Sequence, residues 1–192
     1  MPPKVKVTQQ QIIQVSLEIV RQEGIDALNA RAIARKLDCS IQPIFKNFET
    51  MGSLKKQLIQ SAQTVYDKYI QEGMTSPANP FLGMGLGYIR FAKEEKNLFK
   101  LLFMTNEFKQ NGLIQIIKDD ENQEVVKLIS KMSGLDLKKS EMLFIDIWIT
   151  THGIASMIAT NDLALDEAEV TKILRDAFAG FKHQLMIEEE ER

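Results

Sequence analysis

The stretch LDCSIQPIFKNF, residues 37–48, decides the fold because a proline stands inside a segment that otherwise favours helix. In a helix interior proline costs about 3 kcal/mol or more, since it lacks an N–H group and clashes with an earlier carbonyl. If Ser40 is the N-cap, Pro43 falls in the first helical turn, where N–H groups have no intrahelical partner anyway. The Ser40 hydroxyl then caps the Gln42 N–H, and a helix runs from Ser40 to about Asn47.

The segments before this stretch have their own helix signals. Thr8 is the expected N-cap of a first helix, and Gly24 is expected to end that helix as a left-handed C-cap residue. Asn29 caps a short second helix, and Asp38 lies in the tight turn that joins it to the third. Apolar residues recur at helical spacing almost throughout the chain and alternating strand patterns are absent, which predicts an all-α protein of eight or nine helices.

After the third helix, the apolar spacing predicts a long linking helix at about 51–73 and then a linker at 74–80. The glycine-rich GMGLG at 83–87 lies in a helical segment and indicates close helix packing. A long apolar helix is expected at about 140–159, and the D-x-x-E pattern at 166–169 forms a capping box for the last helix.

Basic residues gather near the N-terminus. The chain has a formal net charge of −2, but residues 1–60 hold nine Lys or Arg and five Asp or Glu, a net of +4. The remaining 132 residues have a net charge of −6. We expect that only the basic N-terminal part meets a polyanion, although chance fluctuation in surface charge is the alternative. We place a domain boundary at residue 50, between domains 1–50 and 51–192.

Composition and cysteine usage indicate a cytoplasmic protein. Hydrophobic residues make up 44% of the 192 residues and charged residues 26%, as in ordinary soluble proteins. Cys39 is the only cysteine, which fits a reducing compartment. The most apolar window, 142–159, contains Asp146 and His152, so we expect a buried helix and no membrane span.

Two short helices joined by a three-residue turn form the pattern of a helix-turn-helix, whose second helix enters the DNA major groove. Helical hairpins are common, so a plain structural hairpin is the alternative on spacing alone. Specific residues at this spacing are Glu23-Gly24, Ala32-Ile33-Ala34, Leu37-Asp38-Cys39-Ser40, Ile44-Phe45, Phe48 and Leu54. In these positions the chain resembles the DNA-binding region of the tetracycline-repressor (TetR) family of bacterial transcription regulators. The resemblance covers about residues 8–60, roughly a quarter of the chain.

The resemblance implies an N-terminal three-helix helix-turn-helix DNA-binding domain and a C-terminal helical ligand-binding and dimerisation domain. Three positions depart from the family pattern. Asp38 replaces the turn glycine and must adopt a left-handed conformation, at a cost of about 1 kcal/mol. Phe45 replaces a tyrosine, and Met51 replaces a lysine whose phosphate contact Lys55 or Lys56 would have to supply. These departures predict weaker phosphate contacts than are typical of the family.

Carried over to this sequence, the resemblance makes Gln42 the expected base-reading residue. Its amide can form two hydrogen bonds with adenine, worth about 1–3 kcal/mol of discrimination. The residues expected to line the groove are Ser40, Ile41, Pro43 and Phe45. The candidates for phosphate contacts are Thr8, Arg31, Lys46, Asn47 and Lys55, with a solvated surface charge as the alternative for each basic residue. Ile44 and Phe48 are expected in the core.

The C-terminal half is expected to form a homodimer. A helix that is apolar on nearly all sides must be buried on nearly all sides, against its own chain and a twofold partner. We assign dimerisation to the helices at about 140–160 and 166–187, in a four-helix arrangement.

The motif WITTHG, residues 148–153, resembles the W-x-x-x-H-G pattern in the ligand domain of one subgroup of the family. His152 either hydrogen-bonds a ligand or is a satisfied interior histidine, and the second is favoured. A pocket for a small apolar effector would be lined by Phe99, Phe103, Met104, Phe108, Trp148 and His152. Plain core packing is the commoner role of such aromatic and Met residues, and a Met-containing lining would suit an adaptable apolar site.

The sequence does not indicate an enzyme. Its two histidines are 31 residues apart without metal-ligand spacing, no phosphate-binding glycine loop follows a strand, and no cofactor or metal is expected. The expected function is a ligand-responsive repressor that binds a palindromic operator as a dimer and is released by an inducer. The competing hypotheses are a helical adaptor and a small helical enzyme or carrier. A flat dependence of DNA affinity on salt would favour the adaptor, and turnover that survives deletion of residues 1–48 would favour the enzyme.

Overall fold

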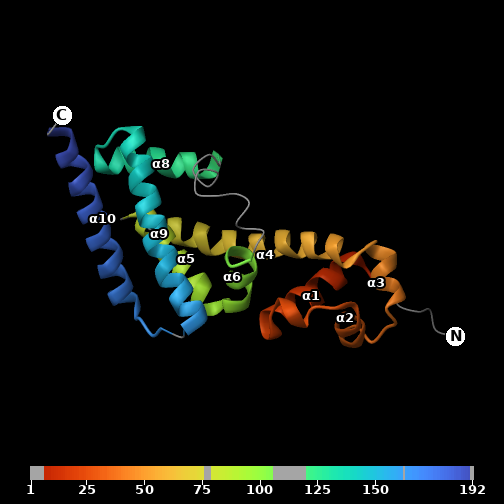
Figure 1. Cartoon of the computed structure of the whole chain (residues 1–192). Helices are drawn as coiled ribbons and strands as arrows, with labels where there is room; N and C mark the ends of the chain where they lie inside the picture. The colour runs from red at the N-terminus through yellow and green to blue at the C-terminus, as the bar shows by residue number, and fades with distance from the viewer. Residues whose placement is uncertain (1–6, 76–78, 106–119, 162, 191–192) are drawn as a thin grey trace. The chain divides into compact units, whose positions relative to one another are not determined.

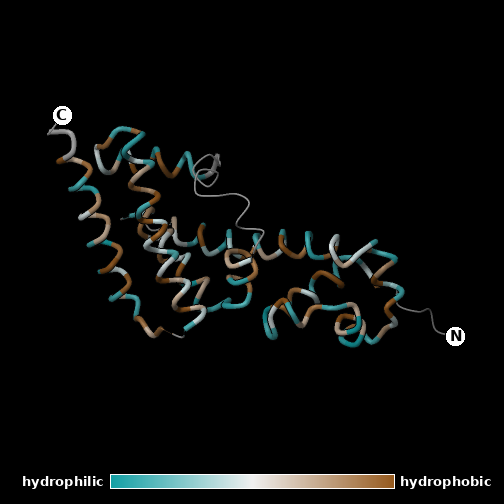
Figure 2. The backbone as a smooth tube through the Cα atoms, in the orientation of Figure 1, coloured by the Kyte–Doolittle hydropathy of each residue, from teal (hydrophilic) through white to brown (hydrophobic). Residues whose placement is uncertain are grey.

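The computed structural model describes residues 7–75, 79–105, 120–161 and 163–190, which form helices and contain no strand (Figure 1). The expected all-α class is confirmed for this part of the chain. Apolar and polar residues are interspersed along the helices, as expected for helices with one apolar and one polar side (Figure 2). The chain divides into two compact units, Met1–Tyr66 with Glu95–Met104, and Asp67–Glu94 with Thr105–Arg192.

The first unit contains the short N-terminal helices. These are α1 (Gln9–Glu23), a 3-10 turn (Ile25–Ala27), α2 (Ala30–Lys36) and α3 (Gln42–Asn47), followed by the first part of α4 (Met51–Met74) and by α6 (Lys96–Phe103). Thr8 caps α1 in a capping box with Gln11, and Asn29 Oδ1 accepts a hydrogen bond of 2.9 Å from the Ala32 N–H at the start of α2. Both expected N-caps are confirmed.

Gly24 ends α1 as expected, but its conformation differs from the predicted left-handed helical one. Its φ of 84° is positive, which favours glycine, whereas its ψ of 171° is extended. The chain therefore leaves α1 in an extended direction and enters the 3-10 turn directly.

The core of the first unit joins α6 to the N-terminal helices, so this unit extends beyond the expected domain of residues 1–50. Arg21 Nε on α1 donates to Glu95 Oε2 at 2.7 Å, and Asn97 Nδ2 donates to the Arg21 carbonyl at 3.0 Å. The fully buried side chains of the unit include Ile12, Ile33, Ile44, Leu54, Leu58, Leu98 and Phe99.

The second unit consists of longer helices. These are the end of α4, α5 (Pro80–Glu94), α8 (Asp120–Ser133), α9 (Leu137–Asn161) and α10 (Glu167–Glu190). The capping box before α10 is confirmed, with hydrogen bonds of 2.8 and 2.9 Å between Asp166 and Glu169. A core cluster holds Phe81, Val125, Val126, Ile129, Leu135, Leu143, Phe144, Ile147 and Leu185.

Within the second unit, glycines bring α4 and α5 into close contact. A Cβ atom at Gly87 would lie 2.3 Å from the Tyr69 carbonyl oxygen, and one at Gly73 would lie 2.1 Å from the Gly83 carbonyl oxygen. Real Cβ atoms do not approach a backbone oxygen so closely. The close packing predicted from GMGLG at 83–87 is therefore confirmed.

The long apolar helix α9 buries one side and exposes another. It is long and apolar enough to cross a membrane, by length and composition alone. Its buried residues include Leu143, Phe144, Ile147 and Ile154, whereas Ile149 is 48% exposed. The chain itself thus covers only part of the apolar surface that the sequence predicts for this helix.

Candidate functional site

The turn between α2 and α3 is held by backbone hydrogen bonds and one residue of positive φ. The Cys39 N–H donates to the Ala34 carbonyl at 3.0 Å, and the Asp38 N–H donates to the Arg35 carbonyl at 3.3 Å. Asp38 has φ 49°, the left-handed value that its position predicts. Asp38 therefore adopts the left-handed backbone conformation that was expected of the residue at this position.

The predicted cap of the third helix is wrong. The helix begins at Gln42, its N-cap position is Ile41, and no side chain forms a capping hydrogen bond there. The physical reason lies in Pro43, which removes one of the N–H groups that a cap could serve. The Ile44 N–H already donates to the Ile41 carbonyl at 3.1 Å, so a Ser40 hydroxyl has little left to satisfy. The placement of Pro43 in the first turn is confirmed.

The helix α3 has one buried side and one exposed side. Ile44 and Phe48 are buried, as predicted, and anchor the helix in the first unit. Ile41, directly before the helix, and Phe45 within it are each 44% exposed. The other residues predicted to meet DNA are exposed or half-buried here: Ser40, Gln42 and Lys46 are exposed, and Pro43 and Asn47 are half-buried.

Two of the residues predicted to contact phosphate use their hydrogen-bond donors inside the protein. Asn47 Nδ2 donates to the Pro43 carbonyl at 2.7 Å and to the Val7 carbonyl at 3.3 Å. The Thr8 hydroxyl lies 3.1 Å from Gln11 Oε1, to which it donates. Asn47 therefore has no amide hydrogen left for a phosphate, and Thr8 has its hydroxyl hydrogen engaged in the capping box.

Exposed cations lie on α3 and on the helices that precede and follow it. Arg31, Lys46 and Lys55 are exposed, and within the described residues no hydrogen bond or ion pair engages them. Arg35 shares these properties and was not among the predicted contacts. Its spacing of four residues from Arg31, on the same side of α2, was the signal that could have identified it.

The six residues predicted to line a ligand pocket are divided between the two compact units. Phe99 and Phe103 pack in the first unit, with ring centroids 5.3 Å apart, and Met104 lies exposed in the same unit. Trp148 and His152 belong to the second unit, where their rings stack at 5.0 Å. Phe108 lies outside the described residues.

His152 has partners on both ring nitrogens, as the satisfied interior histidine requires. Its Nδ1 lies 2.9 Å from the Tyr88 hydroxyl and its Nε2 lies 3.3 Å from the Ser156 hydroxyl. Burial lowers the pKa of His152 below its ordinary value of 6.5. The ring is thus held neutral, with one nitrogen as donor and the other as acceptor.

This environment predicts a pH-dependent contribution of His152 to stability. Because the pKa is lower in the folded state, the contribution is present above pH 6.5 and is lost as pH falls through the folded pKa. We expect the free energy of unfolding to decrease more between pH 7.5 and pH 5.5 for the wild type than for His152→Gln. Trp148 is the only tryptophan and its ring stacks on that of His152, so its fluorescence reports unfolding of this region. The exposed His183, replaced by Gln, is the control, and identical pH profiles for wild type and His152→Gln would refute the assignment.

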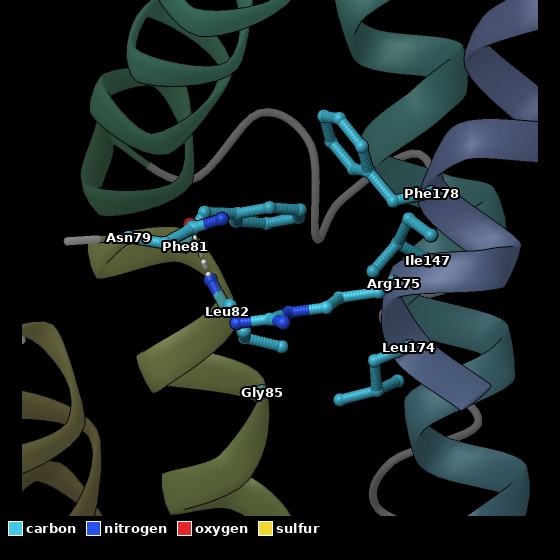
Figure 3. A pocket seen from close by; sticks show the side chains of 8 residues that line it. All are labelled: Asn79, Phe81, Leu82, Gly85, Ile147, Leu174, Arg175 and Phe178. Atoms are coloured by element: carbon cyan, nitrogen blue, oxygen red, sulfur yellow. Dashed lines mark hydrogen bonds between the residues drawn. The ribbon is translucent and has the colours of Figure 1, made fainter. Parts of the chain in front are cut away.

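A small cavity in the second unit, between α5, α9 and α10, contains residues that sequence reasoning did not predict (Figure 3). Its volume is about 80 Å³. Arg175 extends from α10 across the cavity towards Leu82 on α5. The lining residues are Asn79, Phe81, Leu82, Gly85, Ile147, Leu174, Arg175 and Phe178. No short motif joins these residues, so no sequence pattern could have identified the cavity.

Neither metal-binding geometry nor comparison with known proteins identifies a further functional site. Within the described ranges, no group of three or more His, Cys, Asp or Glu is placed to hold a metal ion. The chain matches no protein-family model and no curated protein. The resemblance in residues 8–60 therefore rests on the motif residues themselves.

Proposed function

We propose that the chain is a ligand-responsive DNA-binding transcriptional regulator, a repressor that binds a palindromic operator as a homodimer and is released by a small-molecule inducer. The observation that carries the proposal is the exposed side of α3. There, Ile41 and Phe45 are 44% exposed beside the polar Gln42 and Lys46, while the other side of the helix is buried. A short helix that follows a tight turn and exposes such a mixture suits the major groove, where thymine methyl groups and base edges are both accessible.

The charges of the first unit support a polyanionic partner. Arg31, Arg35, Lys46, Lys55 and Lys56 are exposed, and no hydrogen bond or ion pair with another described residue engages them. Arg21 and Lys36, in contrast, pair with carboxylates at 2.7 and 3.7 Å. Unpaired cations on α2, α3 and the start of α4 can bind phosphates and release counterions, which supplies most of the affinity for DNA of any sequence.

The exposed apolar residues of the second unit support a homodimer. Many of the large apolar side chains that remain exposed lie on α9 and α10 within the ranges assigned to dimerisation: Met142, Ile149, Met157, Ile173, Phe181 and Met186. Met142, Ile149 and Met157 share one side of α9, at spacings of seven and eight residues. A second copy packed through both helices would remove this apolar surface from water.

The continuous helix α4 supports a coupling between an effector and DNA. Its first part belongs to the first unit and its last part to the second unit. We propose that an effector bound in the second unit tilts α4 and changes the separation of the two α3 helices in the dimer. Such coupling is typically worth about 1–3 kcal/mol, enough to change operator occupancy severalfold.

Binding to duplex DNA tests the proposal. DNA flanking the gene of this protein is used in a gel shift, with and without a metabolite extract, and the bound sequence is then titrated at several salt concentrations. We expect the logarithm of affinity to fall linearly with the logarithm of salt. A flat response would contradict the proposal and favour a protein-binding adaptor.

Single substitutions on α3 should separate base reading from phosphate contact. Gln42→Ala is expected to reduce the preference for cognate over random DNA by about 1–3 kcal/mol. Lys46→Ala is expected to weaken both DNAs alike and to lower the salt slope by about one. Lys68→Ala, an exposed lysine on α4 in the second unit, is the control. Equal effects of Gln42→Ala and Lys46→Ala on cognate and random DNA would refute these assignments.

A further inference from the structure

Arg175 is a cation of the second unit that has no partner among the described residues, whereas Arg90 and Lys172 are paired. Arg90 lies 2.5 Å from Glu72 and Lys172 lies 2.5 Å from Asp176. Within the described residues, no hydrogen bond or ion pair engages Arg175, and its side chain extends over the cavity between α5, α9 and α10 (Figure 3). A guanidinium has five N–H donors in a planar fork, which matches the two oxygens of a carboxylate.

The cavity beneath Arg175 is small, and most of the side chains that line it are apolar. Phe81 and Phe178, whose ring centroids lie 5.9 Å apart, contribute to its walls together with Leu82, Ile147 and Leu174. Its volume of about 80 Å³ is about half that of an engineered apolar cavity of about 150 Å³ that binds benzene. The space therefore suits a short aliphatic chain and excludes a drug-sized molecule.

The polar groups of the cavity favour a negative charge. Asn79 Oδ1 accepts a hydrogen bond of 2.9 Å from the Leu82 N–H, whereas no other described residue accepts a hydrogen bond from its amide nitrogen. Asn79 stands at the start of α5, the positive end of that helix dipole. No Asp or Glu belongs to the lining. Arg175 and the Asn79 amide line the same cavity, and together with the helix terminus they favour an anion in it.

We propose that this cavity binds a short-chain organic carboxylate. The carboxylate accepts hydrogen bonds from the Arg175 guanidinium and the Asn79 amide, and its alkyl chain lies among Phe81, Ile147 and Phe178. A single guanidinium matches the single charge of a carboxylate, and the apolar walls require an alkyl tail. The inference that this ligand is the inducer rests on the proposed function, whereas the inference that it binds the cavity does not.

Calorimetric titration of the full chain with propanoate and butanoate tests the site. We expect saturable binding with a Kd between about 1 μM and 1 mM. Butan-1-ol, of equal chain length to butanoate without its charge, should bind at least about tenfold more weakly, because it cannot form a charged pair with Arg175. Absence of binding by both acids up to about 10 mM, or equal binding of the acid and the alcohol, would overturn the proposal.

A matched pair of variants locates the ligand. Arg175→Met preserves the length and apolar stem of an exposed side chain, so the fold should survive, and it should raise the Kd for butanoate at least about tenfold. Lys182→Met removes a positive charge two turns further along α10, outside the cavity, and should leave the Kd within about twofold. Equal Kd values for the wild type and Arg175→Met would overturn the site.

The role of the ligand as inducer is tested separately on DNA. Butanoate should weaken binding of the wild type to its operator and should leave Arg175→Met bound at the same concentration. Operator binding that butanoate leaves unchanged would overturn the inducer role while calorimetry still decides the site. Failure of the protein to bind DNA at any salt concentration would instead refute the proposed function, and the calorimetric result would stand.

Discussion

Replacing Gly87 by alanine is expected to destabilise the second unit by about 1–3 kcal/mol or more. The added methyl group would lie 2.3 Å from the carbonyl oxygen of Tyr69 and 3.1 Å from its carbonyl carbon. Because these are backbone atoms of α4, no side-chain rotation can relieve the contact. The helices α4 and α5 would have to separate. Chemical denaturation followed by circular dichroism measures the change in the free energy of unfolding.

Gly180→Ala is the matched control for this variant. Gly180 also lies within a helix of the second unit, but a Cβ atom there meets nothing within 4 Å. Alanine should stabilise the helix at this position by up to about 1 kcal/mol, since glycine has the higher conformational entropy when unfolded. Both variants are compared at two protein concentrations, so that a change in association is recognised. A Gly87→Ala protein as stable as the wild type would show that α4 and α5 are not so closely packed.

Ile149→Glu is expected to abolish the proposed homodimer. Ile149 is 48% exposed on α9, on the side that also presents Met142 and Met157. A twofold interface through this side would bury the new carboxylate in both copies, and each unpaired buried charge costs several kcal/mol. Light scattering after gel filtration should give the mass of one chain, 21.9 kDa, instead of twice that value. Affinity for a palindromic operator should fall with the loss of the second α3 helix.

Leu137→Glu is the control for the dimer. Leu137 is 55% exposed and is the first residue of α9, before the range of about 140–160 assigned to dimerisation. A carboxylate in the first turn is compatible with the helix dipole, so the fold should be retained. We expect this variant to remain dimeric. A monomeric wild type, or a dimeric Ile149→Glu, would contradict the assignment of α9 to the interface.

The parts of the fold that depend on neighbouring residues could be predicted closely. Thr8, Asn29 and Asp166 cap their helices as expected, and Asp38 adopts its left-handed conformation. Each of these features is decided by side chains and backbone groups within three or four residues. The prediction for Ser40 was wrong because a cap also depends on which N–H groups remain to be satisfied. Pro43 has no N–H group, and the Ile44 N–H already donates to the Ile41 carbonyl.

The grouping of distant residues could not be predicted in the same way. Phe99 and Trp148 were both assigned to one pocket because each is apolar, yet they belong to different compact units. The hydrogen bonds of Asn47 to the Pro43 and Val7 carbonyls likewise depend on where α3 meets the N-terminal segment. Residue type indicates that a side chain will be buried, but not which other side chains it will contact.

By itself, the sequence determined the all-α class, the N-caps at Thr8, Asn29 and Asp166, the placement of Pro43 in a first turn and the basic character of residues 1–60. These follow from local hydrogen bonding and from helical periodicity, which short segments contain in full. Only the tertiary structure decided that α6 joins the first unit and that Asn79, Ile147 and Arg175 line one cavity. Asn79 directly precedes α5, whereas Ile147 and Arg175 lie on α9 and α10. Only the packing of these helices brings an unpaired guanidinium over a cavity lined mostly by apolar side chains.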